Sequence, residues 1–410
     1  MDLLNRLKAC VPDERDIPVL LAAAVGGQQR LLKSGVIEYL TGGPKYSIFA
    51  RVRYKNGQID RFQPGTVLLS PKAQDKFIAQ VSNDAAQTHG SFVSRRALFS
   101  EVPLRGCFQW RERFRISPCP KTARIGSGLD WFAFASSQLT RKNFSHLGPP
   151  FPFVMEVRTF RSPNRFLEES RALRDLDTHQ YLLTLLLHGR FRYAQHDFER
   201  RWTYVMRRKR IEYHLLHQGF DSGLDGRAEG FARRRMCSAP IYKGPDYYNH
   251  LWGGDDQLHM PDTIVSDLML YDALPRDLLR RFNRACYWYS LGVQFNKESA
   301  LSTIAFANAV ECLLPRPSKS QCSSCGKPSG PGPTKLFTQH LKKYGVLPPS
   351  LAWRRDSIYG VRSALVHGSH AKRTDEDLFG SVDPSVDSLL TEIVTQRSLL
   401  GWLRDTRRPT

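Results

Sequence analysis

The fold of the last third of the chain is decided by the stretch Pro275-Arg-Asp-Leu-Leu-Arg-Arg-Phe-Asn-Arg-Ala-Cys-Tyr-Trp-Tyr-Ser-Leu-Gly-Val293. Proline suits the first turn of a helix, because the N–H that it lacks would have no partner there. Apolar residues then recur at steps of three and four, the spacing of one helix face. They are Leu278, Leu279, Phe282, Ala285, Cys286, Tyr289 and Val293. The stretch therefore predicts a helix with one buried side.

Four more helices are predicted between this stretch and the C-terminus. They run from about Ser299 to Leu314, from Lys335 to Tyr344, from Ala352 to Val366, and onward from Pro384 with Asp383 as N-cap. A loop rich in serine, glycine and proline separates the second helix from the third, and the connections are otherwise mostly short. Helices that each carry an apolar face and follow one another closely pack as a bundle.

The part of the chain before residue 150 has a different pattern. Tyr46–Tyr54 alternates apolar and polar residues and ends at Lys55-Asn-Gly57, which is typical of a β-hairpin, and Phe62–Leu69 resembles a second strand. A proline-rich boundary follows at Gly148–Pro152, and then a helix from Phe166 to His188. We therefore expect an α+β multidomain chain, with a β-rich N-terminal domain (1–150), a basic mixed α/β middle region (151–274) and a C-terminal all-α bundle (275–410).

The length and the net charge of the chain limit the number of domains and the type of partner that we expect. At 410 residues the chain is long enough for two or three domains, and its net charge of +21 favours a polyanionic partner. Nucleic acid is the commonest such partner, although the charge could also serve solubility alone. The sequence has no apolar run long enough to span a membrane and no secretory signal, so we expect a cytoplasmic protein with reduced cysteines.

The stretch Arg190–Arg235 is strongly basic, with twelve basic and six acidic residues and interleaved aromatic side chains. Such a mixture suits phosphate contacts combined with base stacking. An equally good interpretation is a pair of strands with solvated arginines. The candidate RNA-binding residues are Arg207, Arg208, Lys209, Arg210, Arg233, Arg234 and Arg235.

The segment Arg362-Ser-Ala-Leu-Val-His367 carries the residues for a chemical reaction. Neutral histidine is a general base near pH 7 and could take the proton of a ribose 2′-hydroxyl, while arginine could neutralise the charge on the phosphate. Arg362 and His367 lie about 140° apart on an ideal helix, so they converge only if His367 sits at the frayed helix end. Ser363 shares a face with His367, and its hydroxyl could hold the imidazole in one tautomer. Alone, this spacing is a weak signal.

The wider context strengthens that signal. The segment Ile358-Tyr-Gly-Val-Arg-Ser-Ala-Leu-Val-His-Gly368 resembles the signature of the HEPN superfamily, in particular of its Apea-type branch. The earlier segment Phe306-Ala-Asn-Ala-Val-Glu-Cys-Leu-Leu314 is similar to that family's second helix, which carries a glutamate in an apolar run. The resemblance covers about Pro275 to Arg404, less than a third of the chain. The loop between helices two and three is longer than in the simplest members.

The resemblance implies a helical bundle that forms a homodimer or higher oligomer, with two motifs facing one cleft. It implies a metal-independent endoribonuclease, a toxin or antiviral-defence effector, that needs no cofactor for catalysis. By carry-over, Arg362 and His367 are catalytic, Ser363 holds the polar position after the arginine, and Glu311 orients Arg362 or forms a structural ion pair. The N-terminal region would then meet a phage-derived or other trigger. The alternatives are a non-catalytic RNA- or nucleotide-binding module and a nucleic-acid-binding regulator.

Two cysteines in the long loop have the spacing of a zinc knuckle. Cys322 and Cys325 supply two ligands, whereas a closed zinc site needs four. Cys312 and His340 are the nearest spare ligands in the sequence, and His370 is another. The sequence leaves two interpretations open, a structural zinc site or a pair of exposed loop thiols.

Overall fold

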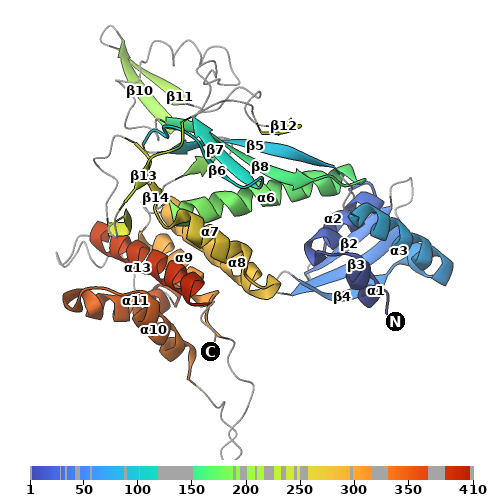
Figure 1. Cartoon of the computed structure of the whole chain (residues 1–410). Helices are drawn as coiled ribbons and strands as arrows, with labels where there is room; N and C mark the ends of the chain where they lie inside the picture. The colour runs from blue at the N-terminus through green and yellow to red at the C-terminus, as the bar shows by residue number, and fades with distance from the viewer. Residues whose placement is uncertain are drawn as a thin grey trace, which may run out of the picture. The chain divides into compact units, whose positions relative to one another are not determined.

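The structure is a computed structural model that describes residues 2–27, 29–32, 35–41, 47–55, 58–86, 90–100, 102–118, 151–187, 191–193, 201–207, 210–216, 226–231, 237–243, 247–249, 257–295, 299–315, 331–367 and 384–406. Strands are concentrated in the earlier part of the chain and helices in the C-terminal part, so the protein is mixed α+β, as predicted (Figure 1). The chain forms two compact units. The first comprises Met1–Ser94, Val157–Asp175 and Arg227–Phe231, and the second comprises Arg95–Glu156, Leu176–Gly226 and Ala232–Thr410. The three-domain organisation stays a prediction.

The first unit contains an antiparallel sheet whose four strands follow one another in chain order. They are β1 (Gln29–Leu31), β2 (Val36–Thr41), β3 (Ser47–Lys55) and β4 (Gln58–Pro64). The predicted strand and hairpin are confirmed, since Lys55 of β3 lies opposite Gln58 of β4. The second predicted strand is wrong in its bounds: β4 ends at Pro64, and Thr66–Leu68 forms a 3₁₀-helix. The breaker pair of proline and glycine explains the early end.

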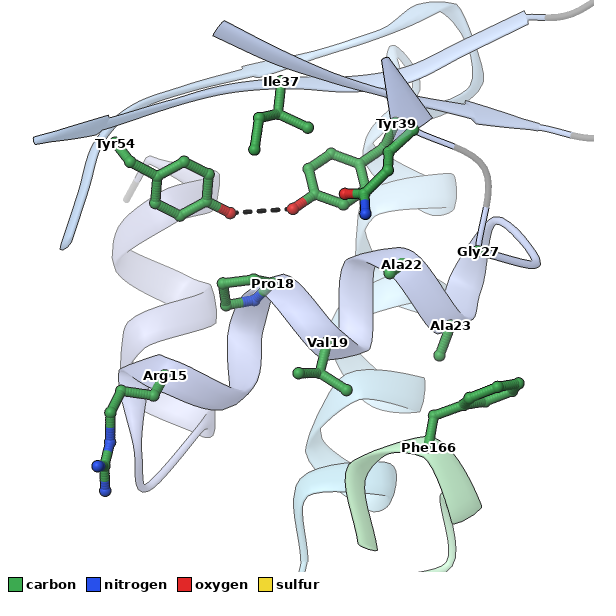
Figure 2. A pocket seen from close by; sticks show the side chains of 11 residues that line it. Arg15, Pro18, Val19, Ala22, Ala23, Gly27, Ile37, Tyr39, Tyr54 and Phe166 are labelled. Atoms are coloured by element: carbon green, nitrogen blue, oxygen red, sulfur yellow. Dashed lines mark hydrogen bonds between the residues drawn. The ribbon is translucent and has the colours of Figure 1, made fainter. Parts of the chain in front are cut away.

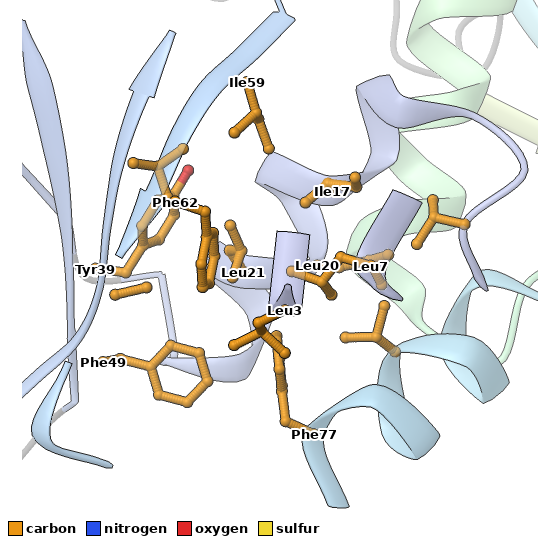
Figure 3. Close-up of a cluster of buried hydrophobic side chains, with 14 of the residues drawn as sticks. Leu3, Leu7, Ile17, Leu20, Leu21, Tyr39, Phe49, Ile59, Phe62 and Phe77 are labelled. Atoms are coloured by element: carbon orange, nitrogen blue, oxygen red, sulfur yellow. The ribbon is translucent and has the colours of Figure 1, made fainter. Parts of the chain in front are cut away.

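Three helices of this unit were not predicted, and they correct the expectation that the first 150 residues hold only strands and turns. They are α1 (Leu3–Cys10), α2 (Ile17–Ala24) and α3 (Pro71–Ala85). Figure 3 shows their apolar side chains meeting those of the sheet in one core, with Leu3, Leu7, Ile17, Leu20, Leu21 and Phe77 from the helices and Tyr39, Phe49, Ile59 and Phe62 from the strands. The helices thus cover one face of the sheet and exclude water from it.

A buried carboxylate fixes the start of α2. Asp16 is fully buried. It accepts hydrogen bonds from Arg171, whose Nη2 lies 2.7 Å from Oδ2, and from Arg174. Both arginines belong to α6 (Arg165–Leu186), which confirms the predicted helix after residue 165. A buried charge is tolerated only when it is paired in this way.

A second sheet has the strand order β12-β5-β8-β7-β6, and β9 also pairs with β5. The strands are β5 (Ser91–Ser100), β6 (Phe108–Trp110), β7 (Phe114–Pro118), β8 (Phe151–Phe160), β9 (Arg192–Tyr193) and β12 (Gly226–Ala228). Within the second unit, buried Glu156 of β8 pairs with Arg95 of β5 and Arg115 of β7. These ion pairs cross the sheet from strand to strand.

The five predicted C-terminal helices are all present. They are α8 (Arg276–Gln294), α9 (Ser299–Glu311), α10 (Pro333–Tyr344), α11 (Ala352–Val366) and α13 (Pro384–Asp405), and a further helix, α7 (Ile264–Asp272), precedes them. Helix α9 packs against α8, α11 and α13, while α10 packs against α11 and α13. Helix α13 also contacts α7 and α8, so α9 and α13 together form the centre of this group of helices. None of the helices in the described ranges is long and apolar enough to cross a membrane.

Candidate active site

Helix α11 presents the Arg-x4-His segment. It ends at Val366, and His367 is its C-cap, with φ −87° and ψ 0°. The backbone N–H of His367 donates to the carbonyl of Ser363 over 3.0 Å, which closes the last turn. His367 is exposed. Its side chain is therefore accessible from solvent at the end of the helix.

Arg362 is held by Glu311 of α9. Its Nη2 lies 3.3 Å from both carboxylate oxygens of Glu311. The two side chains are only 21% and 31% exposed. Burial raises the pKa of Glu311, and the charge of Arg362 offsets this only in part. The contact therefore fixes the arginine at some cost to the carboxylate, which agrees both with an orienting role and with a structural ion pair.

Tyr359 supports the same arginine from its own helix, a residue that the sequence analysis had not assigned to the site. The Arg362 guanidinium lies 5.9 Å from the centre of the Tyr359 ring, at the outer limit of a cation–π contact. That ring is 5.0 Å from the ring of Phe337 on α10. Tyr359 and Arg362 are one helical turn apart, and this spacing could have indicated their contact from the sequence. Helices α9, α10 and α11 thus all contribute to the position of Arg362.

One donor of Arg362 remains unused. Its Nε is buried and has no hydrogen-bond partner among the residues that the structure describes. A buried N–H without an acceptor costs about 1–3 kcal/mol, so holding Arg362 in this position has an energetic cost.

The side chains of Ser363 and His367, the other two residues of the motif, do not contact each other through a hydrogen bond in the described structure. Within the described ranges, the His367 imidazole makes no hydrogen bond to Ser363 or to any other residue. Ser363 contacts His367 through its backbone carbonyl instead. The geometry thus brings Arg362 together with Glu311 and Tyr359, and it leaves His367 free to turn toward a substrate.

The predicted RNA-binding arginines of the middle region are described only in part. Strands β10 (Arg201–Arg207) and β11 (Arg210–Leu216) pair antiparallel, with Arg207 opposite Arg210. Arg208, Lys209, Arg233, Arg234 and Arg235 lie outside the described residues. The pair of strands that the sequence left open is therefore present, and RNA binding by these residues stays a prediction.

A cationic face on α8 was missed by the sequence analysis. Arg276, Arg280, Arg284 and Tyr287 follow at steps of three and four and so share one side of the helix. Tyr287 is 41% exposed. Its ring makes edge contacts with Tyr181 and Trp288, at 5.4 Å and 5.5 Å between ring centres. We call this set the α8 face.

The α8 face lies beside the end of α9 that carries Glu311. Arg281 of α8 donates from Nε to the carbonyl of Cys312 over 3.0 Å, and from Nη2 to the carbonyl of Leu314. The charge of Arg284 also reaches the Cys312 thiol, whose pKa it lowers slightly against the larger effect of burial. The arginines of α8 and the Arg362–Glu311 pair therefore occupy the same end of these helices.

The candidate zinc ligands are likewise described only in part. Cys322, Cys325 and His370 lie outside the described residues. Cys312 is half-buried, and burial raises the pKa of its thiol to about 11. His340 is buried against the ring of Tyr344, and burial together with nearby cations lowers its pKa to about 4. Where the chain is described, no three His, Cys, Asp or Glu side chains gather as a metal site.

No protein-family model, no curated protein and no solved structure matches this chain. A function for the site therefore has to be argued from its geometry and from the motif resemblance.

Proposed function

We propose that the C-terminal helices form a HEPN-like bundle and that the protein is a metal-independent endoribonuclease. The observation that carries the proposal is the placement of Arg362. Its guanidinium is held by Glu311 and lies beside Tyr359, while a buried N–H is left without an acceptor in the described chain. His367 lies exposed at the C-terminal end of the same helix. A fixed arginine and an exposed histidine on one helix supply the cation and the base that cleavage of a phosphodiester needs.

The reaction follows from these two groups. The neutral His367 imidazole takes the proton of a ribose 2′-hydroxyl, and the 2′-oxygen forms a bond to the neighbouring phosphorus. Arg362 stabilises the negative charge that builds up on the non-bridging oxygens. The bond from phosphorus to the 5′-oxygen breaks, and that oxygen takes up a proton from water. The products are a 2′,3′-cyclic phosphate and a 5′-hydroxyl, and the steps require no metal.

The α8 face supports RNA as the substrate. Its arginines suit phosphates, and its exposed tyrosine suits an unpaired base, which together are the features of single-strand binding. One arginine of this face, Arg280, pairs with Asp277 of the same helix, whose Oδ1 lies 4.0 Å from Nη1. Asp277 is almost fully exposed, so this pair is weak and the face keeps its positive charge.

Two exposed apolar side chains, near the two ends of α11, support a homodimer. Only Ile358 is buried on this helix. Trp353 is 64% exposed and Val366 is 49% exposed. Helix α9 also exposes one large apolar side chain, Leu301, which is 49% exposed. A second copy packed on α11 would bury Trp353 and Val366 and place two Arg-His motifs near one cleft.

The wider role that we propose is that of a cytoplasmic toxin or antiviral-defence effector. The N-terminal region would respond to a phage-derived or other trigger, and Cys322 and Cys325 would hold a structural zinc apart from the reaction. A second candidate function is a non-catalytic RNA-binding module. It is favoured by one observation, that no side chain in the described ranges orients the His367 imidazole.

Cleavage in the presence of a chelator separates the two functions. The full-length protein would be mixed with a labelled single-stranded RNA in EDTA, and the ends of the products identified. We expect 2′,3′-cyclic phosphate and 5′-hydroxyl ends, which disappear in His367→Ala and Arg362→Ala. The control is Arg355→Ala, because Arg355 lies on the same helix but pairs with Asp356. Binding without cleavage by the folded parent protein would leave the binding module as the function.

A further inference from the structure

The first unit contains a groove that the proposed nuclease does not use. Its volume is about 520 Å³, within the range of small-molecule sites. Figure 2 shows that Pro18, Val19, Ala22 and Ala23 of α2 line it along its length, with sheet residues on one side and Phe166 of α6 on the other. Arg15 lies at one end and Gly27 at the other.

The composition of α2 shows that this groove favours an apolar occupant. Every residue of the helix is apolar, Ile-Pro-Val-Leu-Leu-Ala-Ala-Ala. Ile17, Leu20 and Leu21 are buried in the core, whereas Pro18 and Val19 on the other face stay half-buried. A helix that is apolar on all sides is normally covered on all sides. The groove is the uncovered half of this helix.

The polar side chains that line the groove are Arg15, Gln29 and a pair of tyrosines whose hydroxyls lie together. The oxygens of Tyr39 and Tyr54 lie 3.0 Å apart and share one hydrogen bond (Figure 2). Whichever hydroxyl donates, the other keeps its own O–H free for a ligand. Burial raises the pKa of both phenols, so both remain protonated donors at neutral pH. The pair therefore selects a hydrogen-bond acceptor.

The only charged residue that lines the groove among the described residues is already compensated. Arg15 donates from Nε and Nη2 to the carboxylate of Asp13, at 2.9 Å and 2.6 Å from Oδ2. Burial alone would raise the pKa of Asp13, but the hydrogen bonds and charge of Arg15 lower it to about 2. The ion pair thus persists at neutral pH, and the groove has no net charge to attract an anion.

We propose that this groove binds an uncharged, planar aromatic small molecule whose hydrogen-bond acceptor meets the Tyr39–Tyr54 pair. Small alanine side chains leave flat space along α2, and aromatic rings stand on both sides of it. A flat ring system can lie on that surface and contact those rings. This inference is independent of the proposed nuclease activity.

The test uses the full-length protein and three probes, with binding measured by ligand-observed NMR titration. The probes are 2-acetylnaphthalene, which is planar and uncharged and has a ketone; 2-naphthoate, which has the same rings and a negative charge; and decan-2-one, which has the ketone without rings. We expect saturable binding of 2-acetylnaphthalene, and binding of the other two at least about tenfold weaker. Absence of binding by the folded parent protein would overturn the proposal, as would equal binding of decan-2-one.

Two variants test whether 2-acetylnaphthalene binds in the groove. Ala22→Phe fills the floor and should weaken binding of 2-acetylnaphthalene at least about tenfold. Tyr54→Phe keeps the ring, removes one hydroxyl and should weaken binding about two- to tenfold. The control is Ala79→Phe, the same change at an exposed position of α3. Unchanged binding in Ala22→Phe would overturn the proposal. A smaller mass of this variant than of the parent protein in light scattering would also overturn it, because it would mean that a second copy covers the groove in the parent protein.

Discussion

Arg362 of α11 and Glu311 of α9 form an ion pair in which one guanidinium nitrogen lies 3.3 Å from both carboxylate oxygens. The pair joins two helices that are far apart in the chain, and it leaves the Nε of Arg362 buried and without an acceptor among the described residues. Because burial raises the pKa of Glu311, ionising this carboxyl costs more in the folded protein than in the unfolded chain. The ionised carboxylate therefore adds less to stability at neutral pH than a fully compensated ion pair would.

Glu311→Gln should separate the orienting role from a structural one. A carboxyl with a raised folded pKa stabilises the fold below that pKa and destabilises it above, so the neutral amide should unfold at the same or a higher temperature than the parent protein at pH 7. RNA cleavage should nevertheless fall about 10- to 100-fold, because Arg362 loses its charged partner. Melting temperature and cleavage rate would be measured from pH 4 to pH 8. A variant that is less stable but cleaves at the parent rate would contradict the orienting role.

RNA binding should depend on the α8 face. The double variant Arg280→Ala/Arg284→Ala should bind single-stranded RNA more weakly, and the dependence of its affinity on salt should fall by about 0.7 in slope for each lost phosphate contact. Tyr287→Ala should cost about 1–3 kcal/mol through the loss of one stacked base. Fluorescence anisotropy in the His367→Ala background measures binding without cleavage. Arg6→Ala/Arg53→Ala removes equal charge elsewhere and should change little.

The C-terminal helices could be predicted from the sequence because their patterns are strong. Helix α11 was predicted with its observed bounds, since breakers flank a periodic run. Helix α2 was missed for the opposite reason: all its residues are apolar, so no contrast between two faces marks it as helical. A helix can be recognised from hydrophobic periodicity only if one of its faces is polar, and α2 has no polar face.

The sequence could predict only those residues of the candidate site that lie close together along the chain. Arg362, Ser363 and His367 share one short segment, so their residue types and the helix end could be recognised together. Glu311 lies 51 residues earlier, and only the resemblance linked it to Arg362. The contact between Phe337 and Tyr359 could not be predicted in this way. Residue spacing along the sequence does not show which side chains of two different helices pack together. The α8 face was visible in the spacing, but its position beside Glu311 was not.

The exposed apolar side chains of α11 predict a dimer that a single charge can break. Trp353→Glu and Val366→Glu place a carboxylate on exposed apolar positions of this helix, so neither should unfold the protein. Each should shift the mass in light scattering from dimer to monomer and make cleavage slow, because a composite cleft needs two copies. Val346→Glu is the control, since Val346 is exposed but lies outside α11. A monomeric parent protein with a concentration-independent rate would refute the shared cleft.

Metal analysis decides the role of the cysteine pair. If Cys322 and Cys325 hold zinc with two further ligands, protein purified under reducing conditions without chelator should contain about one zinc per chain. Cys322→Ser/Cys325→Ser should lose the metal, whereas Cys10→Ser, a change at a cysteine far away in the sequence, should retain it. Zinc-free protein would favour exposed loop thiols. Cleavage by the parent protein in EDTA would remain the test of metal-independent catalysis.

The Asp16 cluster should contribute more to stability than any surface ion pair of the first unit. Asp16→Ala removes a fully buried carboxylate and leaves Arg171 and Arg174, which are themselves mostly buried, without their shared partner. Losing one member of a buried pair typically costs about 3–5 kcal/mol, because the remaining charge stays desolvated. The matched control is Asp75→Ala, which breaks the pair between Asp75 and Arg6 on the surface. That change should cost at most about 1 kcal/mol, because water screens an exposed pair. Urea unfolding, followed by circular dichroism, gives both values. Equal losses in the two variants would mean that the core of α1, α2, α3 and the sheet holds α2 in place without Asp16.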